Sequence, residues 1–94
     1  MKSIIQNTKE CFICRNYYGI EGSPDDIHHC LSGCRRELAD QDGLWVYLCR
    51  HHHSRLHDFG EFKHQLQAEA QRAFEKKYSH EIWMGRYGKN YEVD

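Results

Sequence analysis

Four histidines of this chain form two pairs whose spacing suits a metal ion. His53 and His57 are four residues apart, which places both imidazoles on one face of a helix. His28 and His29 are adjacent on an expected strand, so one can face an ion while the other points away and acts on water. Three histidine ligands, His28, His53 and His57, would leave coordination positions open, as a catalytic metal requires. Solvent-exposed histidines or a second structural metal site are the alternative explanations.

A second set of residues has the spacing of a structural zinc site. Cys11 and Cys14 form one Cys-x2-Cys pair, and Cys49 and His52 form a Cys-x2-His pair much later in the chain. Two ligands at this spacing converge on one ion through a tight turn, and two such turns complete a tetrahedral site. We therefore expect a structural Zn²⁺ that ties the N-terminal segment to the junction of a strand and a helix. Buried, inert cysteines are the competing interpretation.

Two further cysteines leave a different zinc site open. Cys30 and Cys34 could join the Cys11–Cys14 pair in an all-cysteine site. We rank this arrangement second, because Cys30 directly follows His29 on an expected strand and neighbouring strand residues face opposite sides. Cys34 falls in an expected loop and can equally be a free thiol.

The totals of the sequence agree with a metal-stabilised domain. The chain has 94 residues with a hydrophobic share of only 39%, and domains this small usually need a metal, disulfides or a partner to supplement the core. An odd number of cysteines, five, fits poorly with a closed disulfide set, and the first residues contain no apolar signal run. We expect a cytoplasmic protein with no membrane association. The net charge of −1 argues mildly against a passive nucleic-acid coat protein.

The elements that must position these residues can be predicted in outline. We expect a single domain over residues 1–94, with a polar lead-in over 1–10, a metal-binding core over 11–58, a packing helix over 61–78 and a tail over 79–94. Within the core, 26–31 and 44–48 are expected strands, 51–58 an expected helix and 15–25 a loop. Apolar residues recur every four positions along the amphipathic packing helix, and Asp58 and Gly60 are expected to cap and turn its start. In the tail, Trp83, Tyr87 and Tyr91 are expected to pack on the core.

Three stretches of the sequence resemble the HNH endonucleases, most closely small phage and prophage members. They are Asp26-Ile-His28-His29, Leu48-Cys-Arg-His-His-His53 and Leu56-His57, and the likeness extends over roughly 11–91. The resemblance implies an α+β fold, namely a small zinc-stabilised ββα-metal (HNH, His-Me finger) domain with a C-terminal amphipathic helix. It also implies a metal-dependent endonuclease that hydrolyses phosphodiester bonds of DNA.

The resemblance assigns a role to each candidate residue. His28 would be the strand ligand and His53 and His57 the helix ligands of one catalytic divalent cation, Mg²⁺, Mn²⁺, Ni²⁺ or Zn²⁺. His29 would be the general base that activates water. Arg35 or Arg36 would hold a neighbouring phosphate, with no basis in the sequence for choosing between them. DNA is the expected substrate, and the resemblance does not identify any phage or host protein partner.

The chain departs from the family pattern at one position. The middle asparagine, which helps to hold the base histidine, would fall at Leu44. Asp42, Gln41 or a backbone carbonyl would then have to orient the His29 ring. The main rival interpretation is a zinc-stabilised nucleic-acid-binding module without catalysis, for which the cysteine pairs suffice. A zinc deaminase is excluded, because no His-x-Glu element occurs in the chain.

Overall fold

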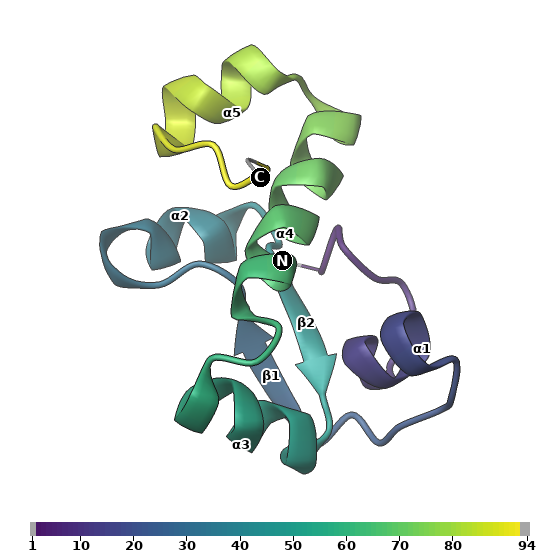
Figure 1. Cartoon of the computed structure of the whole chain (residues 1–94). Coiled ribbons are helices and arrows are strands. Elements are labelled where there is room, and N and C mark those ends of the chain that lie inside the picture. Colours follow the sequence, from purple (N-terminus) through teal and green to yellow (C-terminus); the bar gives the residue numbers. More distant parts are fainter. Residues whose placement is uncertain (1, 93–94) are drawn as a thin grey trace.

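The computed structural model describes residues 2–92 and has an α+β architecture built around a small antiparallel sheet (Figure 1). The sheet has two strands, β1 (Asp26–His29) and β2 (Trp45–Leu48). The helices follow the order α1 (Phe12–Tyr18), α2 (Arg36–Gln41), α3 (Arg50–Phe59), α4 (Lys63–Lys77) and α5 (His80–Tyr87), with a short 3-10 turn η1 at Gly33–Arg35. The strands and α3 and α4 lie where the sequence predicted them.

The register of the sheet determines which residues share a face. Ile27 pairs with Tyr47 and His28 with Val46. Because side chains alternate along a strand, His28 and Val46 lie on one face and Ile27 and Tyr47 on the other. Val46 is fully buried whereas Ile27 is 48% exposed, so the first face is the one packed on the core.

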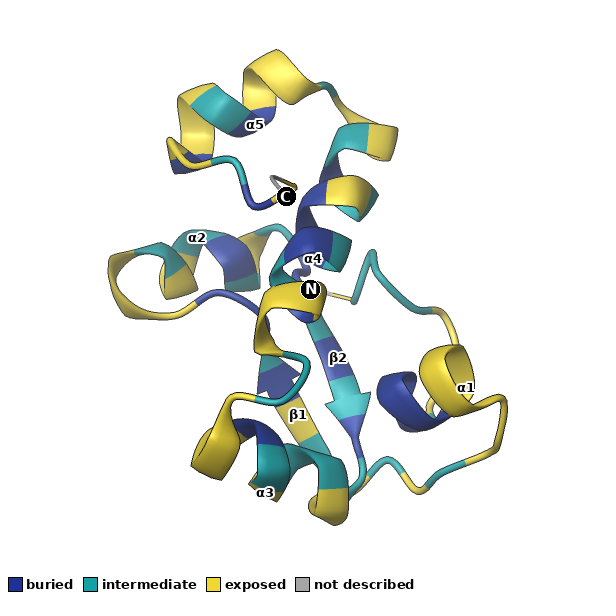
Figure 2. Ribbon diagram, viewed as in Figure 1, coloured by how far each residue is buried: buried dark blue, intermediate teal, exposed yellow. Residues whose placement is uncertain are grey.

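The core joins the sheet to the C-terminal helices (Figure 2). Along α4, Leu66, Ala70 and Phe74 are buried at four-residue intervals, as the apolar periodicity predicted. Trp83 and Tyr87 of α5 contact the Phe74 ring, with ring centroids 5.4 and 5.8 Å away. The expected packing role of the aromatic tail is confirmed, because Trp83, Tyr87 and Tyr91 are all buried.

A buried glutamine fastens the last described residues to α4. Gln71 is fully buried, and its side-chain amide donates to Asn90 while its carbonyl oxygen accepts from the backbone N–H of Tyr91 at 2.6 Å. The indole N–H of Trp83 donates to the carbonyl oxygen of Lys89 at 2.8 Å. These bonds pair the polar groups that this packing buries.

Residues 3–6 run beside β2 and cover its second edge. The backbone N–H of Ile4 donates to the carbonyl oxygen of Gly43, and the Ser3 hydroxyl donates to the carbonyl oxygen of Trp45. The side-chain oxygen of Gln6 accepts from the backbone N–H of Tyr47 at 2.6 Å. The polar lead-in is therefore part of the packed structure.

Three local expectations are wrong. Part of the expected loop over 15–25 is helical, because α1 extends to Tyr18 and ends at Gly19 in the left-handed conformation.

Gly60 ends α3 in that same left-handed conformation and Asp58 lies within α3, so neither residue caps the next helix. The residue before α4 is Phe62, at φ 63° and with no capping side chain. Finally, the expected tail contains a helix, α5, whose N-cap Ser79 accepts from the backbone N–H of Ile82.

None of the helices in the described part of the chain combines the length and the apolar character that crossing a membrane needs.

Candidate metal centres

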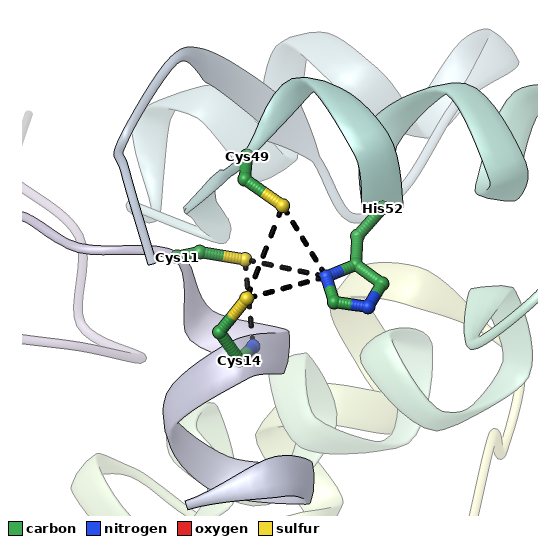
Figure 3. Close-up of side chains that lie close together, drawn as sticks. All are labelled: Cys11, Cys14, Cys49 and His52. Atoms are coloured by element: carbon green, nitrogen blue, oxygen red, sulfur yellow. Dashed lines mark hydrogen bonds between the residues drawn. The ribbon is translucent and has the colours of Figure 1, made fainter. Parts of the chain in front are cut away.

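The two cysteine-containing pairs meet at one point between α1 and α3 (Figure 3). Cys11 is the N-cap residue of α1 and Cys14 lies in its first turn, while Cys49 is the N-cap residue of α3 and His52 lies in its first turn. Two helix starts therefore point their ligands at each other. We call these four residues the cysteine cluster.

Distances within the cysteine cluster match a tetrahedral ion. The Sγ atoms of Cys14 and Cys49 are 3.9 Å apart, and Nδ1 of His52 lies 3.3 Å from Sγ of Cys49 and 3.4 Å from Sγ of Cys14. Tetrahedral zinc with ordinary bond lengths would separate two sulfurs by roughly 3.8 Å and a sulfur from a nitrogen by roughly 3.6 Å. The cluster is thus compatible with structural zinc.

Burial determines how the thiols of this cluster would bind a cation. The pKa of the Cys14 thiol is raised to about 12, first by burial and then by the neighbouring Cys11. Thiolates bind zinc, whereas thiols do not, so the ion must displace protons from the cysteines as it binds. Cys30 and Cys34 belong to no ligand cluster among the described residues, and the all-cysteine alternative is therefore not favoured.

A glycine allows the chain to close over the cysteine cluster. The backbone N–H of Cys11 donates to the carbonyl oxygen of Gly22 at 2.9 Å. A Cβ atom at Gly22 would lie 2.5 Å from Sγ of Cys14, closer than any non-bonded contact allows. The spacing of the cysteines did not indicate that position 22 requires glycine, because this requirement arises where the loop after α1 packs back against Cys11 and Cys14.

The imidazoles of His28, His53 and His57 form a second cluster, which we call the histidine cluster. One nitrogen from each lies within 4.8 Å of the others. Nε2 of His53 and Nε2 of His57 are 3.0 Å apart, near the roughly 3.4 Å expected of two nitrogens on one tetrahedral ion. His28 comes from β1, whereas His53 and His57 come from successive turns of α3.

The histidine cluster is held in a form that suits a cation. Burial, and then the neighbouring His53, lowers the pKa of His28 to about 4, so its ring is neutral and can offer a lone pair at neutral pH. Nδ1 of His53 lies 3.0 Å from a carboxylate oxygen of Asp26. A carboxylate only accepts, so Nδ1 of His53 is the donor to Asp26, and the Nε2 atom of the same ring is the one that faces His57 and could bind an ion.

Asp26 is a site residue whose role the sequence analysis did not identify. Its pKa is lowered by Arg50, which donates two hydrogen bonds to it, and then by His53. Asp26 lies two residues before His28 on β1, so alternation along the strand was the available signal.

His29 lies beside the histidine cluster but faces the other side of the strand. Its Nδ1–H donates to Oδ1 of Asp40 at 2.8 Å. The expected partners were Asp42, Gln41 or a backbone carbonyl. Asp42 instead pairs with Arg86 of α5, and the acceptor is Asp40, one helical residue before Gln41. The carboxylate selects the tautomer of His29 in which the neutral ring has its lone pair on Nε2.

Leu44, where the family pattern has asparagine, is fully buried in the core. Its carbonyl oxygen accepts from the backbone N–H of Cys30 at 3.1 Å. This bond joins the two strands next to His29, so position 44 supports the sheet through its backbone while Asp40 holds the imidazole.

A cleft of about 430 Å³ opens over the histidine cluster. The three clustered histidines and His29 line it, together with two cationic side chains, Arg36 and Lys63. Arg35 is committed elsewhere, because its Nε–H donates to the carbonyl oxygen of Tyr87. Of the two arginines that the sequence left open, the cleft therefore contains Arg36, and Lys63 is a second cation that the sequence analysis missed.

A scan against protein-family models, a search of curated proteins and a search of solved structures each found no match to this chain.

Proposed function

We propose that this chain is a metal-dependent endonuclease of the HNH type that hydrolyses phosphodiester bonds of DNA. The observation that carries the proposal is the placement of two chemically distinct histidine sets at one cleft. His28, His53 and His57 converge on one point, while His29, held by Asp40, lines the same cleft. An open nitrogen site beside an oriented imidazole is what metal-assisted hydrolysis requires.

The histidine cluster would hold one divalent cation. Its donor set fits, because three imidazole nitrogens are grouped together and Nδ1 of His53 is directed to the carboxylate of Asp26. When bound, such a cation supplies Lewis acidity to a phosphate oxygen. Imidazole suits zinc and nickel particularly well and accommodates other divalent ions.

His29 would act as the general base. Because its Nδ1–H is donated to Asp40, its Nε2 can accept a proton from water. The water oxygen then bonds to phosphorus, the proton passes to Nε2 of His29, and the P–O3′ bond breaks to release the 3′ oxygen. The Asp40 carboxylate would stabilise the imidazolium that results.

Arg36 and Lys63 would position the DNA backbone. They line the cleft from α2 and from the first residue of α4. Arginine pairs with phosphate through two N–H groups, whereas lysine supplies a point charge. Arg36 lies 3.8 Å from a carboxylate oxygen of Asp40 and is 56% exposed, so this weak ion pair leaves it able to bind phosphate.

The deciding experiment is incubation of the purified protein with supercoiled plasmid and magnesium, manganese, nickel or zinc ions. We expect nicking by the wild type and a loss of about 10²- to 10⁴-fold in the His29→Ala variant, with its metal content unchanged. Equal nicking by both proteins would point to a contaminating nuclease and would overturn the proposal.

The second candidate is a zinc-stabilised nucleic-acid-binding module without catalysis. The cysteine cluster favours it, because that cluster alone would stabilise the fold. Metal counting separates the candidates. Two ions per chain, one removed by mild chelation, support the nuclease, whereas one tightly held zinc supports the binding module.

A further inference from the structure

The sheet has an open face that lies opposite the core. Ile27 and Tyr47 pair across it, as do His29 and Trp45. The rings of Trp45 and Tyr47 are 5.2 Å apart and nearly perpendicular, and both side chains are half-buried. The open face thus presents two aromatic rings beside the proposed base.

Three hollows run in sequence from the histidine cluster across this face. The cleft over the cluster shares Ile27 and His29 with a second hollow of about 240 Å³, which Asp40 and Trp45 complete. Trp45 is in turn shared with a third hollow of about 340 Å³, which Tyr47 also lines. We call these three adjoining hollows, linked by shared lining residues, the outer track.

Both ends of the outer track are cationic. Arg36 and Lys63 line the first hollow, and Lys2 and Lys9 line the third. The Lys9 ammonium lies over the Tyr47 ring, 5.8 Å from its centroid.

Acidic groups offset only part of this charge. The one carboxylate that lines these three hollows within residues 2–92 is Asp40, which already pairs with His29 and Arg36. Among the described residues, neither Lys2 nor Lys9 has an acidic partner. Apart from these two lysines, the polar side chains that line the third hollow are uncharged, namely Ser3, Gln6, Asn7 and Thr8.

We propose that the outer track binds an unpaired DNA strand that continues from the phosphate held at the histidine cluster. Aromatic rings flanked by cations are the features that bind single strands, because bases stack on the rings while lysines neutralise phosphates. Bases in a duplex already stack on their neighbours and must be unstacked, at a cost, before a side chain can replace those contacts, so we specify unpaired nucleotides. The placement of one end of the DNA strand at the histidine cluster rests on the proposed nuclease function, but strand binding can be measured without cutting.

The two tryptophans provide a direct probe. Trp83 is fully buried and its indole N–H donates to the protein backbone, whereas Trp45 lies on the outer track. Titrating zinc-loaded protein with oligo(dT), with no other divalent ion added, should quench Trp45 emission by stacking. The Trp45→Phe variant should show no quenching, and a fully paired duplex of the same length should quench less.

Variants then test the aromatic and cationic parts separately. We expect Tyr47→Leu to weaken oligo(dT) binding by about 5- to 100-fold. Lys9→Ala should lower the slope of log affinity against log salt by about 0.7. Lys76→Ala is the matched control, because Lys76 is exposed in the last turn of α4 and lines none of the three hollows. If Tyr47→Leu does not fold, the quenching and Lys9→Ala results remain decisive.

The outcomes separate this proposal from the nuclease proposal. Equal affinity for duplex and oligo(dT), or no difference between Lys9→Ala and Lys76→Ala, overturns the outer track even if plasmid is cut. Strand binding with track-dependent quenching supports it even if no cutting is found. Recovered oligonucleotide is checked for length on a denaturing gel, so that cleavage is recorded independently.

Discussion

The cysteine cluster and the histidine cluster each take two residues from α3 or its N-cap, but they differ in the properties that decide whether a bound ion is structural or catalytic. Cys49 and His52 begin α3 and face two buried cysteines of α1, whereas His53 and His57 face a cleft. The first cluster offers four donors and the second three. A closed site with sulfur donors holds an ion for stability, and an open nitrogen site leaves positions for water and substrate. One helix thereby contributes side chains to a candidate structural centre and to a candidate catalytic one.

Removal of a cysteine ligand should have the largest effect. In Cys49→Ser, zinc loses one of its sulfur donors and the junction of α1 with α3 loses its link. Structural zinc contributes roughly 10–16 kcal/mol in small zinc domains, more than a domain of this size can spare. We expect loss of the cooperative thermal transition, followed by circular dichroism, and loss of bound zinc by elemental analysis. A folded, zinc-free variant would show that the cluster is not structural.

The same loss in the histidine cluster should leave the fold intact. His57 is exposed, so His57→Ala should shift the thermal midpoint little while the weaker of two metal ions is lost. We expect plasmid nicking to fall by at least 100-fold, with zinc in the cysteine cluster retained. Unfolding of this variant to the same degree as Cys49→Ser would remove the distinction between the two clusters.

The partner of His29 sharpens the comparison further. Asp40→Ala should reduce nicking by about 10- to 100-fold, because the imidazole loses its orienting acceptor. Asp40→Asn keeps an oxygen that can accept from Nδ1–H but loses the charge, so it should recover part of the activity. Nitrogen NMR of the His29 ring reports the tautomer directly. Identical spectra in the wild type and Asp40→Ala would contradict this role.

A substitution beside the cysteine cluster should have the smallest effect of the four. Gly22→Ala places a Cβ 2.5 Å from Sγ of Cys14, so the loop or the ligand must shift. Crowding of this kind costs about 1–3 kcal/mol. We expect a lower unfolding midpoint and weaker zinc retention in a chelator competition, and no change in Gly85→Ala, whose added Cβ meets nothing within 4 Å. Equal midpoints for both variants would refute the close approach at Gly22.

The sequence predicted which candidate ligands come together better than it predicted the residues that orient them. Two residues separated by two or three others belong to the same turn or helix. Their relative side-chain directions therefore follow from the type of element and can be predicted from spacing alone. Asp40 was missed because α2 has only six residues and no apolar periodicity, so its side-chain directions were unknown. The residues expected to orient His29 were Asp42 and Gln41, which are nearest to Leu44 in the sequence, whereas the helix turns Asp40 toward His29.

The expected capping of α4 by Asp58 and Gly60 was wrong for a related reason. Gly60 has the chemistry of a helix end as well as of a turn before the next helix, and the structure uses it as the end of α3. α4 then begins after Phe62 with no side-chain cap, a start that no sequence rule predicts. Contacts made by tertiary packing, such as Arg35 with the backbone of Tyr87, were likewise inaccessible from spacing alone.

The segment that covers β2 has a consequence for how this chain behaves at high concentration. Ser3, Ile4 and Gln6 pair the backbone groups of Gly43, Trp45 and Tyr47 along the strand edge. A bare edge of this kind is a template on which another chain can add a strand. Residues 3–6 therefore protect this edge against self-association, and removal of the segment before Asn7 should increase aggregation relative to the unshortened chain.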